Sequence, residues 1–94
     1  MAAITPTIEE VRSGGDHSVI TGTVVVPNTS ANEFAVVGTN GHVIACSVEN
    51  TTAADADVRV AINVEDDYST AKQGTVAITS SAADTYRFVA QAIP

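Results

Sequence analysis

The residues of this chain whose types could do chemistry are two histidines, one cysteine and two groups of carboxylates. His17 and His42 each begin a segment that is typical of a strand. A metal site needs several ligands at a set geometry, and neither His-x-His nor Cys-x-x-Cys spacing occurs. Serine and aspartate are so frequent here that their presence does not indicate a hydrolytic triad. We therefore expect exposed histidines at strand ends, no metal site, no cofactor and a protein that is not an enzyme.

Cys46 and the acidic groups are interpreted in the same way. Cys46 is the only cysteine, so no internal disulfide can form. Because free cysteine is among the most buried residue types, we expect Cys46 to be a small buried side chain on a strand rather than a nucleophile. The carboxylates of Asp55 with Asp57, and of residues 65–67, fit no calcium-loop motif. We interpret them as solvated loops, and calcium binding stays open as an alternative.

The charge balance excludes several classes of partner. Eleven aspartates and glutamates outnumber four lysines and arginines, so the formal net charge is −7. This charge repels phosphate backbones and anionic lipid headgroups, and the basic residues form no cluster. No apolar segment approaches the roughly 20 residues that span a membrane. The beginning of the chain also lacks the basic and apolar regions of a secretory signal. We expect neither nucleic acid nor a membrane as a partner.

The elements that must position these residues are short strands. Alternating and β-branched residues separated by turn residues predict about seven of them. The fold class is therefore all-β, a small antiparallel β-sandwich or barrel. We expect residues 13–94 to form a single β domain, preceded by residues 1–12 as an N-terminal arm or first strand. The predicted strands are 4–11 with a break near Pro6, 17–27, a hairpin over 34–48 around Asn40-Gly41, 58–65, 75–80 and 85–94.

Alternation also assigns a face to each side chain. In the second arm of the hairpin, the more apolar set is expected to face the core, and it comprises His42, Ile44, Cys46 and Val48. On the last strand, Tyr86 and Phe88 are expected inside. A chain of 94 residues buries only about 60–65% of its unfolded surface, so its core is thin. We therefore expect the half-apolar outer faces to be buried against another copy of the chain or against a larger partner, through Val43, Val89 and Ile93.

Three segments of the sequence carry a resemblance to a known class of proteins. MAAITPTIEEV, HSVITGTVVVP and GTVAITSSAADTYRFVAQAIP are similar to the small virion proteins of tailed bacteriophages, which include head decoration or cement proteins. In such proteins the last strand typically has an aromatic and aliphatic pattern, which residues 87–90 represent here.

The resemblance implies a β-rich protein without catalytic residues, made in the cytoplasm of the bacterial host. It would add in many copies, as a homo-oligomer with a trimer favoured, to the outside of the capsid. Its partner would be the major capsid protein. By binding neighbouring coat subunits, it would stabilise the shell against the pressure of packaged DNA. In these proteins the N-terminal arm often makes the contact, so Ile4, Pro6 and Ile8 are the implied capsid-contact residues. Removing such an arm should leave the fold intact.

Two other functions stay open. One is a phage tail, fibre or head-tail connector module of the same β class. The other is a bacterial carbohydrate-binding or adhesion module. Sugar binding usually uses exposed aromatic rings, so Tyr68 and Tyr86 would then have to lie on the surface.

Overall fold

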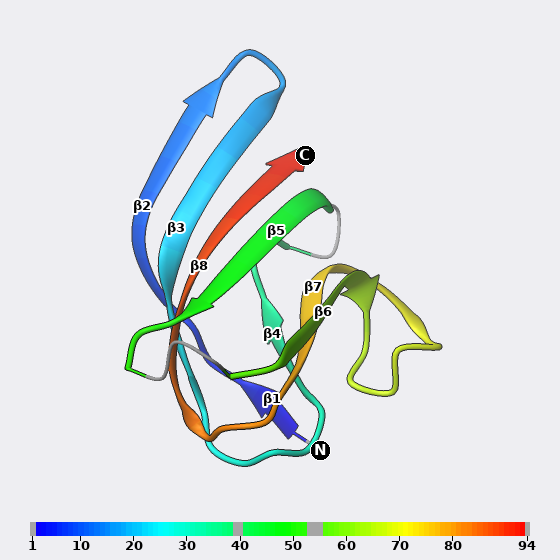
Figure 1. The fold of residues 1–94 in the computed structure, drawn as a ribbon. Helices are drawn as coiled ribbons and strands as arrows, with labels where there is room; N and C mark the ends of the chain where they lie inside the picture. Colours follow the sequence, from blue (N-terminus) through cyan, green and yellow to red (C-terminus); the bar gives the residue numbers. More distant parts are fainter. Residues whose placement is uncertain (1, 39–40, 53–55, 94) are drawn as a thin grey trace.

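The computed structural model describes residues 2–38, 41–52 and 56–93, and these residues form strands and loops only (Figure 1). The predicted all-β class is confirmed. None of the described residues belongs to a helix that could cross a membrane. The described residues contain eight strands: β1 (Ala2–Ile4), β2 (Thr7–Gly14), β3 (His17–Val26), β4 (Asn32–Ala35), β5 (His42–Asn50), β6 (Val58–Val64), β7 (Ala71–Ser80) and β8 (Asp84–Ile93).

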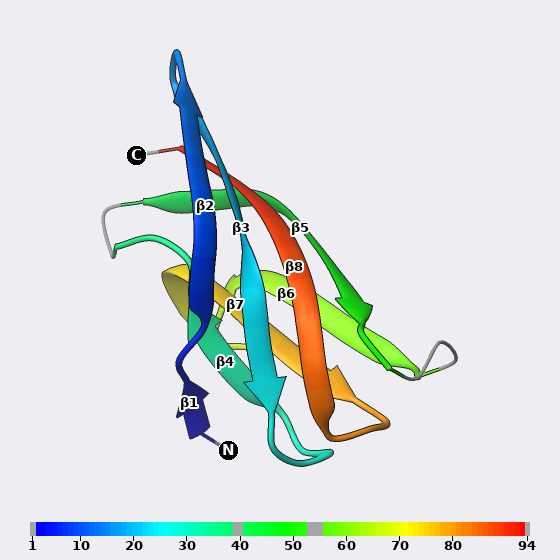
Figure 2. The same ribbon diagram turned by 90° about the vertical axis from the view of Figure 1, so that its left-hand side faces the viewer.

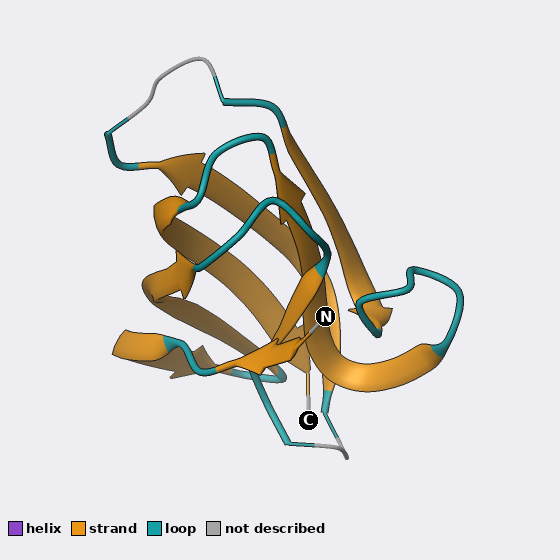
Figure 3. Ribbon diagram, turned by 90° about the horizontal axis from the view of Figure 1, so that it is seen from below, coloured by secondary structure: helices purple, strands orange, loops and turns teal. Residues whose placement is uncertain are grey.

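The strands form two sheets that pack as a β-sandwich. Sheet A has the order β1-β4-β7-β6 and sheet B the order β2-β3-β8-β5. In Figure 2, β3 and β8 of sheet B cross in front of β7 of sheet A, and Figure 3 shows the described chain from below as strands joined by loops. Neighbouring strands run antiparallel except β1 and β4, which are parallel. The prediction of a small antiparallel sandwich is thus confirmed, with one parallel pair added.

The core lies between the two sheets and follows the alternation of the longest strands. On β8, Tyr86 and Phe88 are fully buried while Arg87 and Val89 are exposed, as the period-two pattern predicts. Sheet A contributes Phe34, whose ring centroid lies 5.0 Å from that of Phe88. β-Branched side chains complete the core, namely Ile20, Val24, Val26, Val43, Val76 and Ile78. Because the chain has few aromatic residues, this one contact between sheets contributes a large share of the aromatic packing.

The first strands are part of the sandwich rather than a free arm. β1 pairs with β4 in sheet A, and Ile4 packs against the core. β2 pairs with β3 in sheet B, so the chain changes sheets between residues 4 and 7. The predicted break near Pro6 is confirmed, since Pro6 lies between the two strands and proline cannot donate a ladder hydrogen bond.

The predicted hairpin over residues 34–48 is wrong. β4 pairs with β7 in sheet A, whereas β5 pairs with β8 in sheet B. The connection between them crosses from one sheet to the other, and within it the Gly41 N–H donates to the Gly38 carbonyl at 2.8 Å. Asn40 lies outside the described residues. The Asn-Gly pair favours a tight turn, but a hairpin also needs both arms in one sheet. β4 pairs instead with β7, where Phe34 is buried beside Val76.

The faces of β5 are partly reversed with respect to the prediction. A bulge between Val43 and Ala45 inserts one extra residue against β8. Before the bulge His42 is exposed and Val43 is fully buried, and Ile44, at the bulge, is 37% exposed. After the bulge the predicted order returns, with Cys46 packed against the core. One inserted residue shifts all preceding side chains to the opposite face, so the expectation that Val43 lies at an interface with other copies is wrong.

Asn63 closes the sandwich where β6 meets β5. Its backbone has φ 58°, at a bulge in the pairing of β6 with β7. The side-chain oxygen accepts from the Val43 N–H at 3.0 Å and from the Gly74 N–H at 3.2 Å. The side-chain nitrogen donates to the Val43 carbonyl at 2.6 Å. The amide thus replaces a strand neighbour and links the two sheets.

Candidate functional site

A groove of about 400 Å³ lies beside β1. We call it the β1 groove. Its apolar wall consists of Ile4, Pro6, Ala35 and Val37, and its polar wall includes Glu33 and Lys72. The groove exists because β1 is an edge strand of only three residues, after which the chain leaves sheet A for sheet B. Beyond Ile4, no described strand covers this side of β4.

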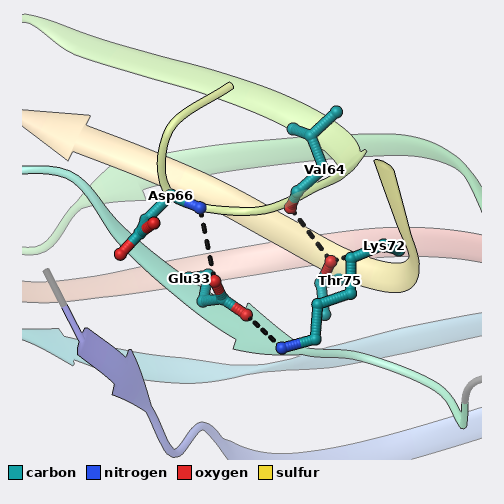
Figure 4. Close-up of polar contacts among 5 residues, drawn as sticks. All are labelled: Glu33, Val64, Asp66, Lys72 and Thr75. Atoms are coloured by element: carbon teal, nitrogen blue, oxygen red, sulfur yellow. Dashed lines mark hydrogen bonds and ion pairs between the residues drawn. The ribbon is translucent and has the colours of Figure 1, made fainter. Parts of the chain in front are cut away.

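The polar wall of the β1 groove includes an ion pair between β4 and β7 of sheet A (Figure 4). Glu33 is only 7% exposed, and its carboxylate accepts from the Lys72 ammonium at 2.6 Å. The other carboxylate oxygen accepts from the Asp66 N–H at 3.3 Å. Glu33 on β4 therefore binds both the start of β7, through Lys72, and the loop before β7, through Asp66. A buried carboxylate with two donors is satisfied, which is what its burial requires.

The hydroxyl of Thr75 completes this network. It lies 3.0 Å from the Val64 carbonyl and 2.6 Å from the Lys72 carbonyl, and it can donate its one proton to either (Figure 4). Both carbonyls belong to the strands on either side of the β6–β7 connection. The hydroxyl therefore contacts both ends of this connection, and Thr75 also lines the β1 groove.

Electrostatics keep the groove wall charged but balanced. The hydrogen bond that Lys72 donates to Glu33, and then the negative charge of Glu33, raise the pKa of Lys72 above its usual value, with smaller contributions from Glu65 and Asp66. Lys72 therefore remains an ammonium and stays paired with Glu33. Because each charge faces its partner, the groove offers hydrogen bonds and apolar contact to a ligand rather than a free acid or base.

The structure separates the three predicted capsid-contact residues. Ile4 and Pro6 both line the β1 groove and are half-buried. Ile8 lies on β2 and is 42% exposed, and it does not line the groove. Of the residues expected at an interface between copies, Val89 is 40% exposed on the outer face of sheet B, and Ile93 is half-buried.

The candidate chemical residues are not brought together. His17 is exposed at the start of β3 and lies 2.8 Å from the Asp16 carboxylate, while His42 is exposed at the start of β5. Burial raises the pKa of the Cys46 thiol to about 11, which disfavours the nucleophilic thiolate. Within residues 2–38, 41–52 and 56–93, no three His, Cys, Asp or Glu side chains are placed to hold a metal ion.

The acidic groups have local structural contacts. Hydrogen bonds from Thr70 and from the Ser69 backbone lower the pKa of Asp67 to about 2. Asp67 thus stabilises its own turn as a carboxylate. Asp55 lies outside the described residues, and Asp57 is exposed, its backbone N–H bound to the Ser81 hydroxyl at 2.9 Å.

Neither tyrosine is an exposed platform for a sugar ring. Tyr86 is fully buried, and its hydroxyl contacts Ser80 and donates to the Ala82 carbonyl at 2.8 Å. Tyr68 is half-buried, and the Arg59 guanidinium lies 3.9 Å from the centre of its ring. The two phenylalanines are buried as well. All four aromatic residues of the chain therefore serve packing or internal contacts.

Sequence reasoning missed Glu33, Lys72 and Asn63 as key polar residues. Glu33 lies outside the predicted strands, and its partner Lys72 is 39 positions away. The only local signal at Asn63 is its residue type, since asparagine tolerates positive φ better than most residues. No protein-family model, curated protein or solved structure matches this chain. Its function is therefore inferred from its own surfaces.

Proposed function

We propose that this protein is a structural virion protein that binds the outside of a bacteriophage capsid as a decoration protein and stabilises the shell by contact, without catalysis. The observation that carries the proposal is the β1 groove, an apolar channel beside a sheet edge with a fixed ion pair in its wall. Such a surface suits an extended protein segment better than a small substrate, because a strand edge supplies main-chain hydrogen bonds and the groove accepts side chains.

The partner in this proposal is the major capsid protein. In sheet A, β1 pairs with β4 on one side and has no described strand on the other. An extended coat segment can add there and place apolar side chains against Ile4 and Pro6. This keeps two of the implied contact residues in the interface, in a sheet edge rather than in a detached arm.

The net charge supports the outer position on the shell. At −7 the chain repels nucleic acid, so a surface away from packaged DNA is favourable for it. The proposed location is therefore the capsid exterior, reached after synthesis in the cytoplasm of the host bacterium.

The proposal is tested by counting copies. Virus particles are sedimented, and quantitative mass spectrometry gives the ratio of this chain to the major coat protein. We expect one copy per coat subunit or a simple fraction of that number. A handful of copies per particle would instead indicate a tail, fibre or connector module, and absence from the particles would reject the virion proposal.

The contact surface is tested by one matched pair of variants. Ala35 is exposed in the wall of the β1 groove, so Ala35→Glu adds a charge there without filling the core. Ala83→Glu adds the same charge at an exposed turn before β8. In co-sedimentation with undecorated particles, Ala35→Glu should abolish binding and Ala83→Glu should retain it. Equal binding by both variants would show that the groove is not the contact.

A further inference from the structure

The β2 edge of sheet B is a second interaction surface, separate from the β1 groove. All eight residues of β2 are exposed, and among the described strands β2 pairs only with β3. In Figure 1 the β2–β3 hairpin extends beyond the other strands, at the end of the molecule opposite the N-terminus. A free strand of this kind offers a row of backbone donors and acceptors to another strand.

The register of the hairpin shows which backbone groups point outward. Gly14 pairs with His17 across a two-residue loop in which Gly15 has φ 64°. In an antiparallel ladder, hydrogen-bonded pairs alternate with pairs whose backbone groups face away from each other. The pair that closes a two-residue loop is hydrogen-bonded, so Val11 and Ser13 direct their N–H and C=O groups toward the free edge.

A side-chain contact supports this assignment. Ser13 and Ser18 are opposite each other, and their hydroxyl oxygens are 3.1 Å apart. Side chains approach more closely in the pairs without backbone hydrogen bonds. The alternation then makes Val11 and Ile20 another such pair, because they lie two positions further along the ladder.

The charges beside Val11 are arranged symmetrically. Glu10 and Arg12 flank it, lie on the same side of the strand and form an ion pair at 3.2 Å with both side chains exposed. A second β2 strand running antiparallel, with a two-fold axis at Val11, places each Glu10 opposite Arg12 of the other copy. Opposite charges directly across two strands stabilise their pairing.

The apolar side chain at the centre also fits a second copy. Val11 is 57% exposed, although it faces the same side of the sheet as the buried Ile20. In the symmetric arrangement the two Val11 side chains lie side by side, and each covers part of the other. The bulge between Ile8 and Glu10 limits the regular pairing to the segment after it.

We infer that two copies of this chain pair through antiparallel β2 strands about a two-fold axis at Val11, which joins two copies of sheet B into one continuous sheet. The contact is short, so the dimer is weak and forms at high protein concentration. This inference does not depend on capsid binding, because it uses a different edge from the β1 groove.

The test reverses the charges at Glu10 and Arg12 and measures whether the dimer still forms. Glu10→Lys and Arg12→Glu each place like charges opposite each other in a homodimer. Sedimentation velocity should show that each variant dissociates at least about tenfold more readily than the natural chain, which corresponds to about 1.4 kcal/mol. The double variant restores opposite charges and should dimerise again. A mixture of the two single variants should form a heterodimer, which native mass spectrometry distinguishes by mass.

A backbone variant provides the control for folding. Val11→Pro removes an N–H that points to the free edge, so it should abolish the dimer while the circular dichroism spectrum stays unchanged. Arg12→Pro removes an N–H that faces β3 and should disturb the hairpin itself. The inference is overturned if the natural chain stays monomeric up to about 1 mM, or if the charge variants dimerise as well as the natural chain.

Discussion

The Asn63 side chain links the two sheets, because it hydrogen-bonds Val43 of sheet B and Gly74 of sheet A. Replacing it with alanine leaves the Val43 N–H and carbonyl and the Gly74 N–H without their partner, in a region that is buried. Unpaired buried groups cost about 1–3 kcal/mol each, in part relieved by local adjustment. We expect Asn63→Ala to lower the free energy of unfolding in urea by about 2–4 kcal/mol.

Glycine at the same position separates the two contributions of Asn63. Asn63→Gly also loses the amide but accepts φ 58° without the steric cost that alanine has there. It should therefore be about 1 kcal/mol less destabilising than alanine. If both variants unfold at the same urea concentration as the natural chain, the amide does not hold the sheets together.

Cys46 should be slow to react while the protein is folded. Burial raises the pKa of its thiol from 9.0 to about 11, so at neutral pH the thiolate fraction is lower by about a hundredfold. We expect iodoacetamide to label the folded protein about a hundred times more slowly than the urea-unfolded protein at pH 8. Similar rates in the two states would contradict the burial of this thiol.

The same shift has a consequence for stability at high pH. Since the folded state favours the neutral thiol, its contribution is fully present below pH 9.0 and is lost as the pH rises toward about 11. The free energy of unfolding of the natural chain should therefore fall over this pH range. The fall should be smaller for Cys46→Ala, which has no thiol to titrate.

At the scale of elements, β1 is expected to stabilise the domain. If the first residues were a free arm, removing them would leave the fold intact, but β1 pairs with β4 and Ile4 packs on the core. Removing residues 1–5 loses this pairing and half-buried apolar surface. We expect a loss of about 2 kcal/mol in the free energy of unfolding, seen as a lower thermal midpoint. An unchanged midpoint would restore the picture of a dispensable arm.

How well an element could be predicted depends on whether its alternation is continuous. β3 and β8 have no bulge in their mutual register, so period two gave the correct inward set, including Tyr86 and Phe88. The bulge in β5 reversed the faces of His42 and Val43, and no local residue pattern marks it. The ion pair of Glu33 with Lys72 joins strands far apart in sequence, so it follows only from the fold.

At the scale of the whole molecule, the net charge should govern how the proposed dimer responds to salt. Each copy carries −7, spread over a body whose radius of gyration is 12.3 Å. At 150 mM salt the Debye length is about 8 Å, so long-range repulsion between copies is largely screened. We expect the dimer fraction in sedimentation equilibrium to rise between about 20 and 150 mM salt. A fall would mean that screening of the Glu10–Arg12 pairs dominates.

The class of the molecule could be predicted, but its topology could not. Short alternating segments between turn residues are sufficient for an all-β sandwich. The order of strands depends on contacts between distant segments, such as the parallel pairing of β1 with β4 and the insertion of β8 between β3 and β5. A signal confined to neighbouring residues contains no information about these pairings.

The central position of β8 also determines when this chain can fold. β8 is synthesised after every other described strand, yet it lies between β3 and β5 and supplies Tyr86 and Phe88 to the core. Until residues 84–93 leave the ribosome, β5 has no neighbour in sheet B and one side of β3 is open. Pairing over such long sequence separations is slow, in the range of about milliseconds to seconds. Sheet B is therefore expected to form only after residues 84–93 have left the ribosome.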